Sequence, residues 1–228
     1  MPSASEWITR LRTWEAPRWP EMIDAQSGLP GPRANLALVE AVAQMADTST
    51  VDALLSYGSE YTAMCAAAAL GRAAGSPGGA ERARSSATDS RWRVREGVVI
   101  GLQLWADADP EPMRRLMARW VDDADPLVQR AAIAAGCEPR LLRTPEAAAA
   151  ALALCARATD ALARADAAQR RSAPFRTLRQ TLGYAWSVAI AADPAPGLAA
   201  FRALADVDPD VAWIVRENRR KKRLATLL

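Results

Sequence analysis

The sequence predicts an all-α protein, and three observations support this fold class. Alanine, which has the highest helix propensity and is a poor strand former, supplies much of the 50% of the chain that is hydrophobic. It gathers in runs such as CAAAALGRAAG and EAAAAALALCARA, which are typical of closely packed helices. No segment shows the alternation with period two that a half-buried strand requires, and a helix-starting pattern recurs along the chain.

The first thirty residues predict a capping helix followed by a loop. Trp7 and Trp14 stand one heptad apart and Trp19 precedes Pro20, so three of the eight tryptophans lie in the first nineteen residues. We interpret them as the packing side of a cap over the open end of the structure that follows, in preference to an aromatic binding site. The segment SGLPGPR that comes next predicts a loop between helices.

A turn and helix start recur in the segments DSRWRVREGVVIGL, DADPLVQRAAIAAG and DVDPDVAWIVRENR. Each segment opens with an acidic or Ser/Pro turn and then places a valine (Val94, Val128, Val211) before a small or apolar helical run. A fainter copy, GSEYTAMCAAAALG, has Tyr61 at the valine position. The spacing from Tyr61 to Val94 is 33 residues and that from Val94 to Val128 is 34 residues, which indicates a repeated unit.

The chemistry of the turns explains the recurrence. In DPLV and DPDV the aspartate is a helix cap, and Pro126 and Pro209 occupy the first helical turn, where no intrahelical N–H bond is needed. In DADPEPMRRLMARWVDD, Leu116 and Trp120 stand four residues apart and define one apolar helix face. The pattern therefore predicts a first helix, a short loop and a second helix in each repeat.

This pattern resembles HEAT repeats, the helical pairs that share an α-solenoid architecture with armadillo repeats. The resemblance rests on the D-x-D-P-x-V motif and its spacing, covers roughly Ser59 to the C-terminus, and is degenerate over residues 145–200. It implies a right-handed α-solenoid of about five to six antiparallel helix pairs. We expect a single domain over residues 1–228, with a capping helix and loop at 1–30, helical repeats at 33–206 and a basic C-terminal helix at 207–228.

The absence of histidine excludes much chemistry. Ser-His-Asp and Cys-His nucleophile systems and histidine-based metal sites cannot form, and there is neither a Walker A motif nor a GxGxxG after a strand. Any catalysis would depend on carboxylates, tyrosine, cysteine or cofactor chemistry. We therefore expect a non-catalytic protein with no metal and no cofactor.

The cysteines Cys65, Cys137 and Cys155 are odd in number, form no C-x-x-C motif and lie in alanine-rich helical sequence. They predict free, buried thiols in a reducing compartment. The N-terminus lacks the apolar region of a secretory signal, and no apolar run is long enough to span a membrane. We expect a cytoplasmic, monomeric protein without a transmembrane segment.

The basic character of the chain is concentrated at its C-terminus. The segment RENRRKKRLATLL carries a net charge of +5, whereas the whole chain carries +3 and the remainder −2. With Trp213, Ile214, Leu224 and Leu227 at roughly helical spacing, the tail should continue the last helix. Its cations are candidates for contact with phosphates, an acidic partner or an anionic membrane surface, or they favour the negative end of the helix dipole on a solvated helix. These candidate residues are Arg219, Arg220, Lys221, Lys222 and Arg223.

A second candidate site is a row of arginines at the starts of repeat helices, namely Arg91, Arg95, Arg130 and Arg179. Equivalent positions of a solenoid align along one face, so these side chains would suit an extended acidic peptide or a nucleic-acid backbone. The alternative is that they pair between repeats with Asp89, Asp123 and Asp125. We expect a scaffold or adaptor that binds a macromolecule, a protein in preference to a nucleic acid, on its concave face.

A third candidate is the pair Trp92 and Glu96, one turn apart at the start of a helix. Their spacing is similar to that of the tryptophan and aspartate of the HEAT-like alkylpurine DNA glycosylases, and Trp120, Gln129 and Arg130 match the following inner helix of that family. The resemblance implies a DNA-binding base-excision enzyme in which Trp92 and Glu96 hold a damaged nucleotide and stabilise an oxocarbenium ion. We favour the alternative, in which Trp92 packs between repeats and Glu96 pairs with an arginine, because the acid is a glutamate and the body of the chain is net negative.

Overall fold

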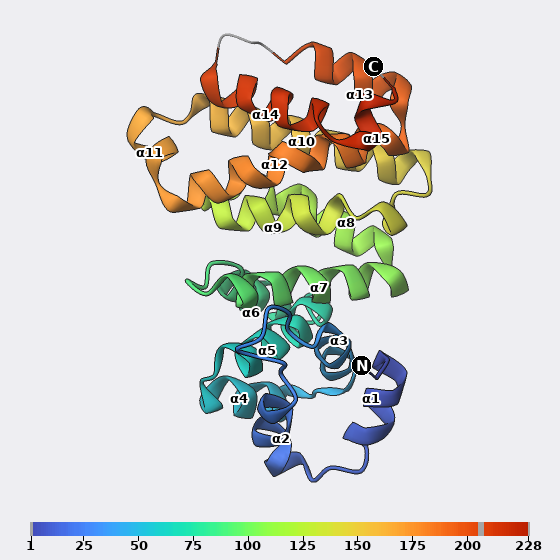
Figure 1. The fold of residues 1–228 in the computed structure, drawn as a ribbon, viewed down its shortest axis with the longest axis vertical. Coiled ribbons are helices and arrows are strands. Elements are labelled where there is room, and N and C mark those ends of the chain that lie inside the picture. The colour runs from blue at the N-terminus through green and yellow to red at the C-terminus, as the bar shows by residue number, and fades with distance from the viewer. Residues whose placement is uncertain (1, 205–207, 228) are drawn as a thin grey trace. The chain divides into compact units, whose positions relative to one another are not determined.

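The computed structural model describes residues 2–204 and 208–227, and within them all regular secondary structure is helical (Figure 1). The prediction of an all-α protein is confirmed. The predicted boundary between repeats and C-terminal helix, at residues 206 and 207, lies outside the described residues. The chain divides into two compact units, unit 1 (Met1–Asp109) and unit 2 (Pro110–Leu228).

Unit 1 contains seven α-helices and one short 3-10 helix among its described residues. In this unit α1, α3, α5 and α7 form a series in which each helix packs against the next, and α4 and α6 pack against α5. The elements are α1 (Ala4–Leu11), η1 (Ala16–Arg18), α2 (Trp19–Ala25), α3 (Leu36–Met45), α4 (Thr48–Tyr57), α5 (Glu60–Arg72), α6 (Gly79–Ala87) and α7 (Trp92–Ala108).

The predicted capping segment contains two short α-helices with a 3-10 helix between them, and not a single helix. Ser3 caps α1, which ends at Leu11, and Pro17 and Pro20 are the second residues of η1 and α2. Trp7 and Trp19 are buried, as expected for packing residues, and α1 packs against α3.

The contact between α5 and α7 is the most extensive in unit 1, because glycine and alanine bring the two backbones close together. Gly97 and Gly101 of α7 face the carbonyl oxygens of Met64 and Ala68 in α5. A Cβ atom at either glycine would overlap the α5 backbone, so only glycine permits this approach. The alanine-rich sequence thus serves backbone packing, which places the first turn of α7 firmly beside α5.

Unit 2 is organised around α12, which packs against α9, α10, α13, α14 and α15. Trp186 of α12 is buried, donates a hydrogen bond of 3.0 Å to Thr159 Oγ1 and packs on Phe201. The elements are α8 (Pro110–Trp120), α9 (Pro126–Gly136), η2 (Pro139–Leu141), α10 (Pro145–Arg164), α11 (Ala167–Arg171), α12 (Ala173–Ala192), α13 (Pro194–Arg202), α14 (Pro209–Arg219) and α15 (Lys222–Ala225).

The repeated helix starts of the sequence have the same local structure in both units. The repeat residues are each the second or third residue of their helix, and each is buried. Asp125 and Asp208 cap α9 and α14 through their carboxylates, with proline at the first helical position, as predicted. The four repeat residues are Tyr61, Val94, Val128 and Val211.

The C-terminal segment differs from the prediction of one continuous helix. The last long helix ends at Arg219, and a separate short helix, α15, begins at Lys222. The break allows Leu224 to turn back and become fully buried, with α15 packed against α12.

The three cysteines are free and buried, as predicted, with the Sγ atoms of Cys137 and Cys155 3.6 Å apart. None of the helices in the described ranges is both long enough and apolar enough to cross a membrane. The described residues also include no group of three or more His, Cys, Asp and Glu side chains that would hold a metal ion.

Candidate functional site

A loop between α2 and α3 and the first turn of α7 enclose two neighbouring pockets on unit 1. Asn35 fixes this loop, because its Oδ1 caps α3 at the N–H of Leu38 and its Nδ2 donates to the carbonyl of Gln26. The buried hydroxyl of Tyr61 donates a 2.7 Å hydrogen bond to the Asn35 carbonyl. Burial raises the pKa of Tyr61 well above its ordinary value, so this hydroxyl stays protonated and acts as a structural donor.

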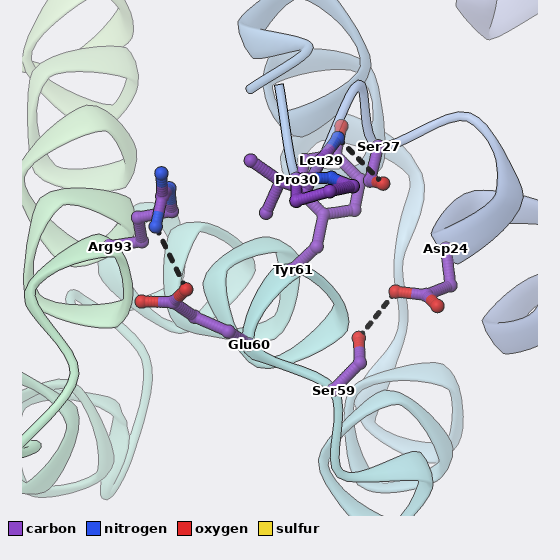
Figure 2. Close-up of a pocket in the computed structure, with 8 residues that line it drawn as sticks. All are labelled: Asp24, Ser27, Leu29, Pro30, Ser59, Glu60, Tyr61 and Arg93. Carbon is purple, nitrogen blue, oxygen red and sulfur yellow. Dashed lines mark hydrogen bonds and ion pairs between the residues drawn. The ribbon is translucent and has the colours of Figure 1, made fainter. Parts of the chain in front are cut away.

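The first pocket is polar and has a volume of about 400 Å³ (Figure 2). The Ser59 hydroxyl donates a 2.6 Å hydrogen bond to the Asp24 carboxylate on one side, and Glu60 and Arg93 form an ion pair of 2.9 Å on the other. The lining residues are Asp24, Ser27, Leu29, Pro30, Ser59, Glu60, Tyr61 and Arg93.

The second pocket is mostly apolar and has a volume of about 440 Å³. Trp92 and Leu36 form part of its walls with exposed fractions of 57% and 49%, which is unusual for side chains of this size. The lining residues are Pro32, Arg33, Ala34, Asn35, Leu36, Ala37, Met64, Trp92, Arg93 and Glu96.

Trp92 and Glu96 therefore line the same pocket, one turn apart at the start of α7, as their spacing in the sequence predicted for one helix face. The favoured interpretation that Trp92 packs between repeats is wrong, because more than half of the residue is exposed. Glu96 is half-buried and engaged in an interaction within the chain.

The two pockets share Arg93, which no pattern in the sequence indicates as a site residue. Its guanidinium lies over the indole of Trp92 while pairing with Glu60 of α5. Leu36 and Met64 were also missed. Apart from the spacing of Trp92 and Glu96, the sequence signal for this site is the Gly/Pro-rich loop, which by itself indicates only a connection between helices.

The predicted arginines of unit 1 stabilise the turn that precedes α7. Arg91 forms an ion pair of 2.8 Å with Asp89, and Arg95 Nη1 donates to the carbonyls of Asp89 and Ser90 at 2.6 and 2.8 Å. The hydrogen bond from Arg91 holds the pKa of Asp89 below its ordinary value. The predicted pairing of Arg91 with Asp89 is thus present, but it is local to one turn.

The predicted arginines of unit 2 also have contacts within the chain. Arg179 forms an ion pair with Asp210 and its guanidinium lies 4.8 Å from the Trp213 ring centroid. Arg130 is half-buried in α9 and is engaged within the chain as well. All four arginines of the predicted row therefore have structural partners, so a ligand would have to compete for them.

The remaining residues of the glycosylase resemblance lie inside unit 2. Trp120 is buried at the end of α8. Gln129 is buried in α9 and donates a 2.7 Å hydrogen bond from Nε2 to the Asp123 carbonyl. Both side chains have structural roles, and neither lines a pocket described above.

The basic C-terminal residues are largely solvent-exposed, with Lys221 half-buried. Arg220 pairs with Glu217 at 2.6 Å. Within the part of the chain that the structure describes, Arg219, Lys222 and Arg223 form no ion pair.

Comparison of the chain with known protein families, curated proteins and solved structures finds no match. The function must therefore be argued from the geometry and charge of the two units.

Proposed function

We propose that the chain is a non-catalytic HEAT-like adaptor that binds a segment of a partner protein on unit 1, around Trp92. One observation carries this proposal: the exposed indole of Trp92 stands with the exposed Leu36 on the walls of a mostly apolar pocket. Exposed apolar surface of this kind marks interaction sites, and tryptophan is enriched among residues that dominate binding energy in protein interfaces.

The charge of unit 1 favours a protein over a nucleic acid at this site. Residues 1–109 contain 10 arginines, no lysine and 13 carboxylates, which gives a net charge of −3. A surface that grips phosphates needs an excess of cations, and the arginines nearest to Trp92 already have carboxylate or carbonyl partners. An apolar side chain of a peptide is not repelled by the negative charge of unit 1 and does not need an arginine without a partner.

The buried repeat residues at 33- and 34-residue spacing support the HEAT-like part of the proposal. We accordingly propose that about five to six helix pairs stack as a right-handed α-solenoid in a cytoplasmic monomer, with the partner on the concave face. Small-angle X-ray scattering tests the shape: a maximum dimension no larger than that of a compact sphere of equal mass would contradict a solenoid.

A selection from a random peptide library displayed on phage tests the binding function. We expect enrichment of peptides with a large apolar anchor. Trp92→Ala should lower the affinity for a synthetic copy of the enriched peptide by about 30-fold, the loss typical of an interface tryptophan. Fluorescence anisotropy with the labelled peptide measures this change. Tyr57→Ala is the matched control, because Tyr57 is 48% exposed on unit 1 but lines neither of the two pockets.

Equal binding by the wild type and Trp92→Ala, or an equal loss in Tyr57→Ala, would reject the site. Circular dichroism of each variant establishes that the helical fold is retained. If no peptide is enriched above background, the adaptor function itself is rejected.

A second candidate function is base excision, and one observation favours it: Trp92 and Glu96 line the same pocket. In that case the protein releases an alkylated purine from methylated duplex DNA, and Glu96→Gln abolishes release. The base-release assay decides the question, because DNA binding alone does not require a catalytic pocket. Absence of release by the wild type rejects this function.

A further inference from the structure

The basic C-terminal segment is fixed to unit 2 by two buried residues. The side chain of Asn218 accepts a 2.9 Å hydrogen bond from the N–H of Ser187 and donates to the carbonyls of Leu182 and Ile214, both at 2.8 Å. Six residues later, Leu224 is fully buried. The backbone that carries the cations between and beside these anchors is therefore held in place, and binding by them needs less ordering than binding by a disordered tail.

Exposed cations lie on both sides of Asn218 in the sequence. Glu217 is the sole acidic residue of the segment 211–227, and it pairs with Arg220. Unit 2 as a whole carries 19 basic and 13 acidic residues, a net charge of +6, so the field around the segment is positive. We define the C-terminal basic patch as the exposed residues Arg216, Arg219, Arg220, Lys222 and Arg223.

An exposed aromatic side chain belongs to the helix against which the patch is packed. Helix α12 packs against both α14 and α15, and its Gly183 faces Trp213 and Glu217 of α14. The next residue, Tyr184, is 40% exposed. In proteins that bind single strands, exposed aromatic side chains are the platforms on which unpaired bases stack.

The apolar residues of the segment argue against a membrane as the partner. Ile214, Val215 and Leu224 are all buried in unit 2, so the patch offers charge without an apolar face to insert. A purely acidic protein segment would use the cations but not the exposed aromatic ring of Tyr184.

We propose that the C-terminal basic patch, together with Tyr184, binds single-stranded nucleic acid through its phosphates and stacked bases, without sequence preference. This site lies on unit 2 and is independent of the peptide site proposed on unit 1. The phosphates would contact the patch cations, and an unpaired base would stack on the ring of Tyr184.

A salt series with a labelled oligothymidine strand tests the proposal, with the full chain and anisotropy as the readout. Arg219→Gln, Lys222→Gln and Arg223→Gln in combination should weaken binding at least about tenfold at low salt. They should also reduce the slope of log K against log salt by about 2, since each lost phosphate contact in a single strand contributes about 0.7. Tyr184→Ala should weaken binding with the slope unchanged, because stacking releases no counterions.

The matched control removes the same charge elsewhere on unit 2, with Arg119→Gln, Arg143→Gln and Arg164→Gln, all exposed and outside the patch. This control should keep most of the affinity and nearly the full slope. An equal loss in the control would overturn the proposal in favour of a general charge effect. Tighter, patch-dependent binding to phosphatidylserine vesicles or to polyglutamate than to oligothymidine would overturn it in favour of a membrane or an acidic protein.

Discussion

The guanidinium carbon of Arg93 lies 4.6 Å from the ring centroid of Trp92, and Nη1 of the same side chain lies 2.9 Å from Oε2 of Glu60. The ion pair to α5 thus holds the cation that covers one face of the exposed indole. An indole that is restrained before binding loses less conformational entropy when a partner packs against it. Arg93 is therefore a positioning residue for Trp92.

Replacing Arg93 tests this positioning. In Arg93→Met the side chain keeps an unbranched apolar stem and loses the guanidinium, so both the ion pair and the cation–π contact are lost. We expect the selected peptide to bind several-fold more weakly, with a loss of about 1 kcal/mol in the free energy of unfolding. Glu60→Gln is the comparison, because it weakens the ion pair and keeps a cation over the ring. Equal affinities of wild type and Arg93→Met would show that Trp92 needs no such support.

Gly101→Ala tests the packing of α5 against α7. A Cβ atom at this position would overlap the carbonyl oxygen of Ala68, so we expect a loss of about 1–3 kcal/mol in the free energy of unfolding. An alanine placed in a helix without a clash stabilises a protein by about 0.4–1 kcal/mol, so the sign of the change is diagnostic. Urea denaturation measures it, and stabilisation would contradict the close approach.

Asn218→Ala tests the anchor of the C-terminal segment. The substitution removes the acceptor for the Ser187 N–H and the donor to the Leu182 carbonyl, in a fully buried position. We expect the free energy of unfolding of unit 2 to fall by about 3 kcal/mol, since each buried polar group left without a partner costs about 1–3 kcal/mol. Thr226→Ala, a change at an exposed residue of the same C-terminal segment, should leave the free energy of unfolding nearly unchanged in the same denaturation measurement.

Asp89→Asn tests the turn before α7 through its pH dependence. The pKa of Asp89 lies below its ordinary value of 3.8 in the folded protein, chiefly because of the hydrogen bond from Arg91. The ionised carboxylate therefore contributes stability above about pH 4, and this contribution is lost as the pH falls through the lowered pKa. We expect the variant to be about 0.5–1 kcal/mol less stable than wild type at pH 7, with the difference closing below pH 3.8. A difference that is constant from pH 7 to pH 2 would contradict the ion pair.

The sequence was sufficient for the fold class because the helix starts are determined locally. Asp125 with Pro126 and Asp208 with Pro209 provide cap and first turn within adjacent residues, and the structure has helices at both places. The C-terminal break was not foreseeable in the same way. It depends on the burial of Leu224 and Asn218 and on the packing of this segment against α12, where Asn218 contacts Leu182 and Ser187, 36 and 31 positions earlier in the chain.

The candidate site was only partly foreseeable for a similar reason. Trp92 and Glu96 share a helix face, so their spacing placed them together. Leu36 and Met64, on the other walls of that pocket, come from α3 and α5, and no periodicity in α7 indicates them. Conversely, spacing does not distinguish an arginine row that binds a ligand from arginines that pair with carboxylates. Arg91 pairs with Asp89, one of the partners that the sequence offered, whereas Arg179 pairs with Asp210, which the sequence did not indicate.

The opposite net charges of the two units mean that the isoelectric point of about 9.0 describes neither of them. At neutral pH an anion exchanger attracts unit 1 and a cation exchanger attracts unit 2, although the chain as a whole is only mildly basic. Retention on either resin will report which half of the molecule faces the matrix, and not the charge of the whole molecule.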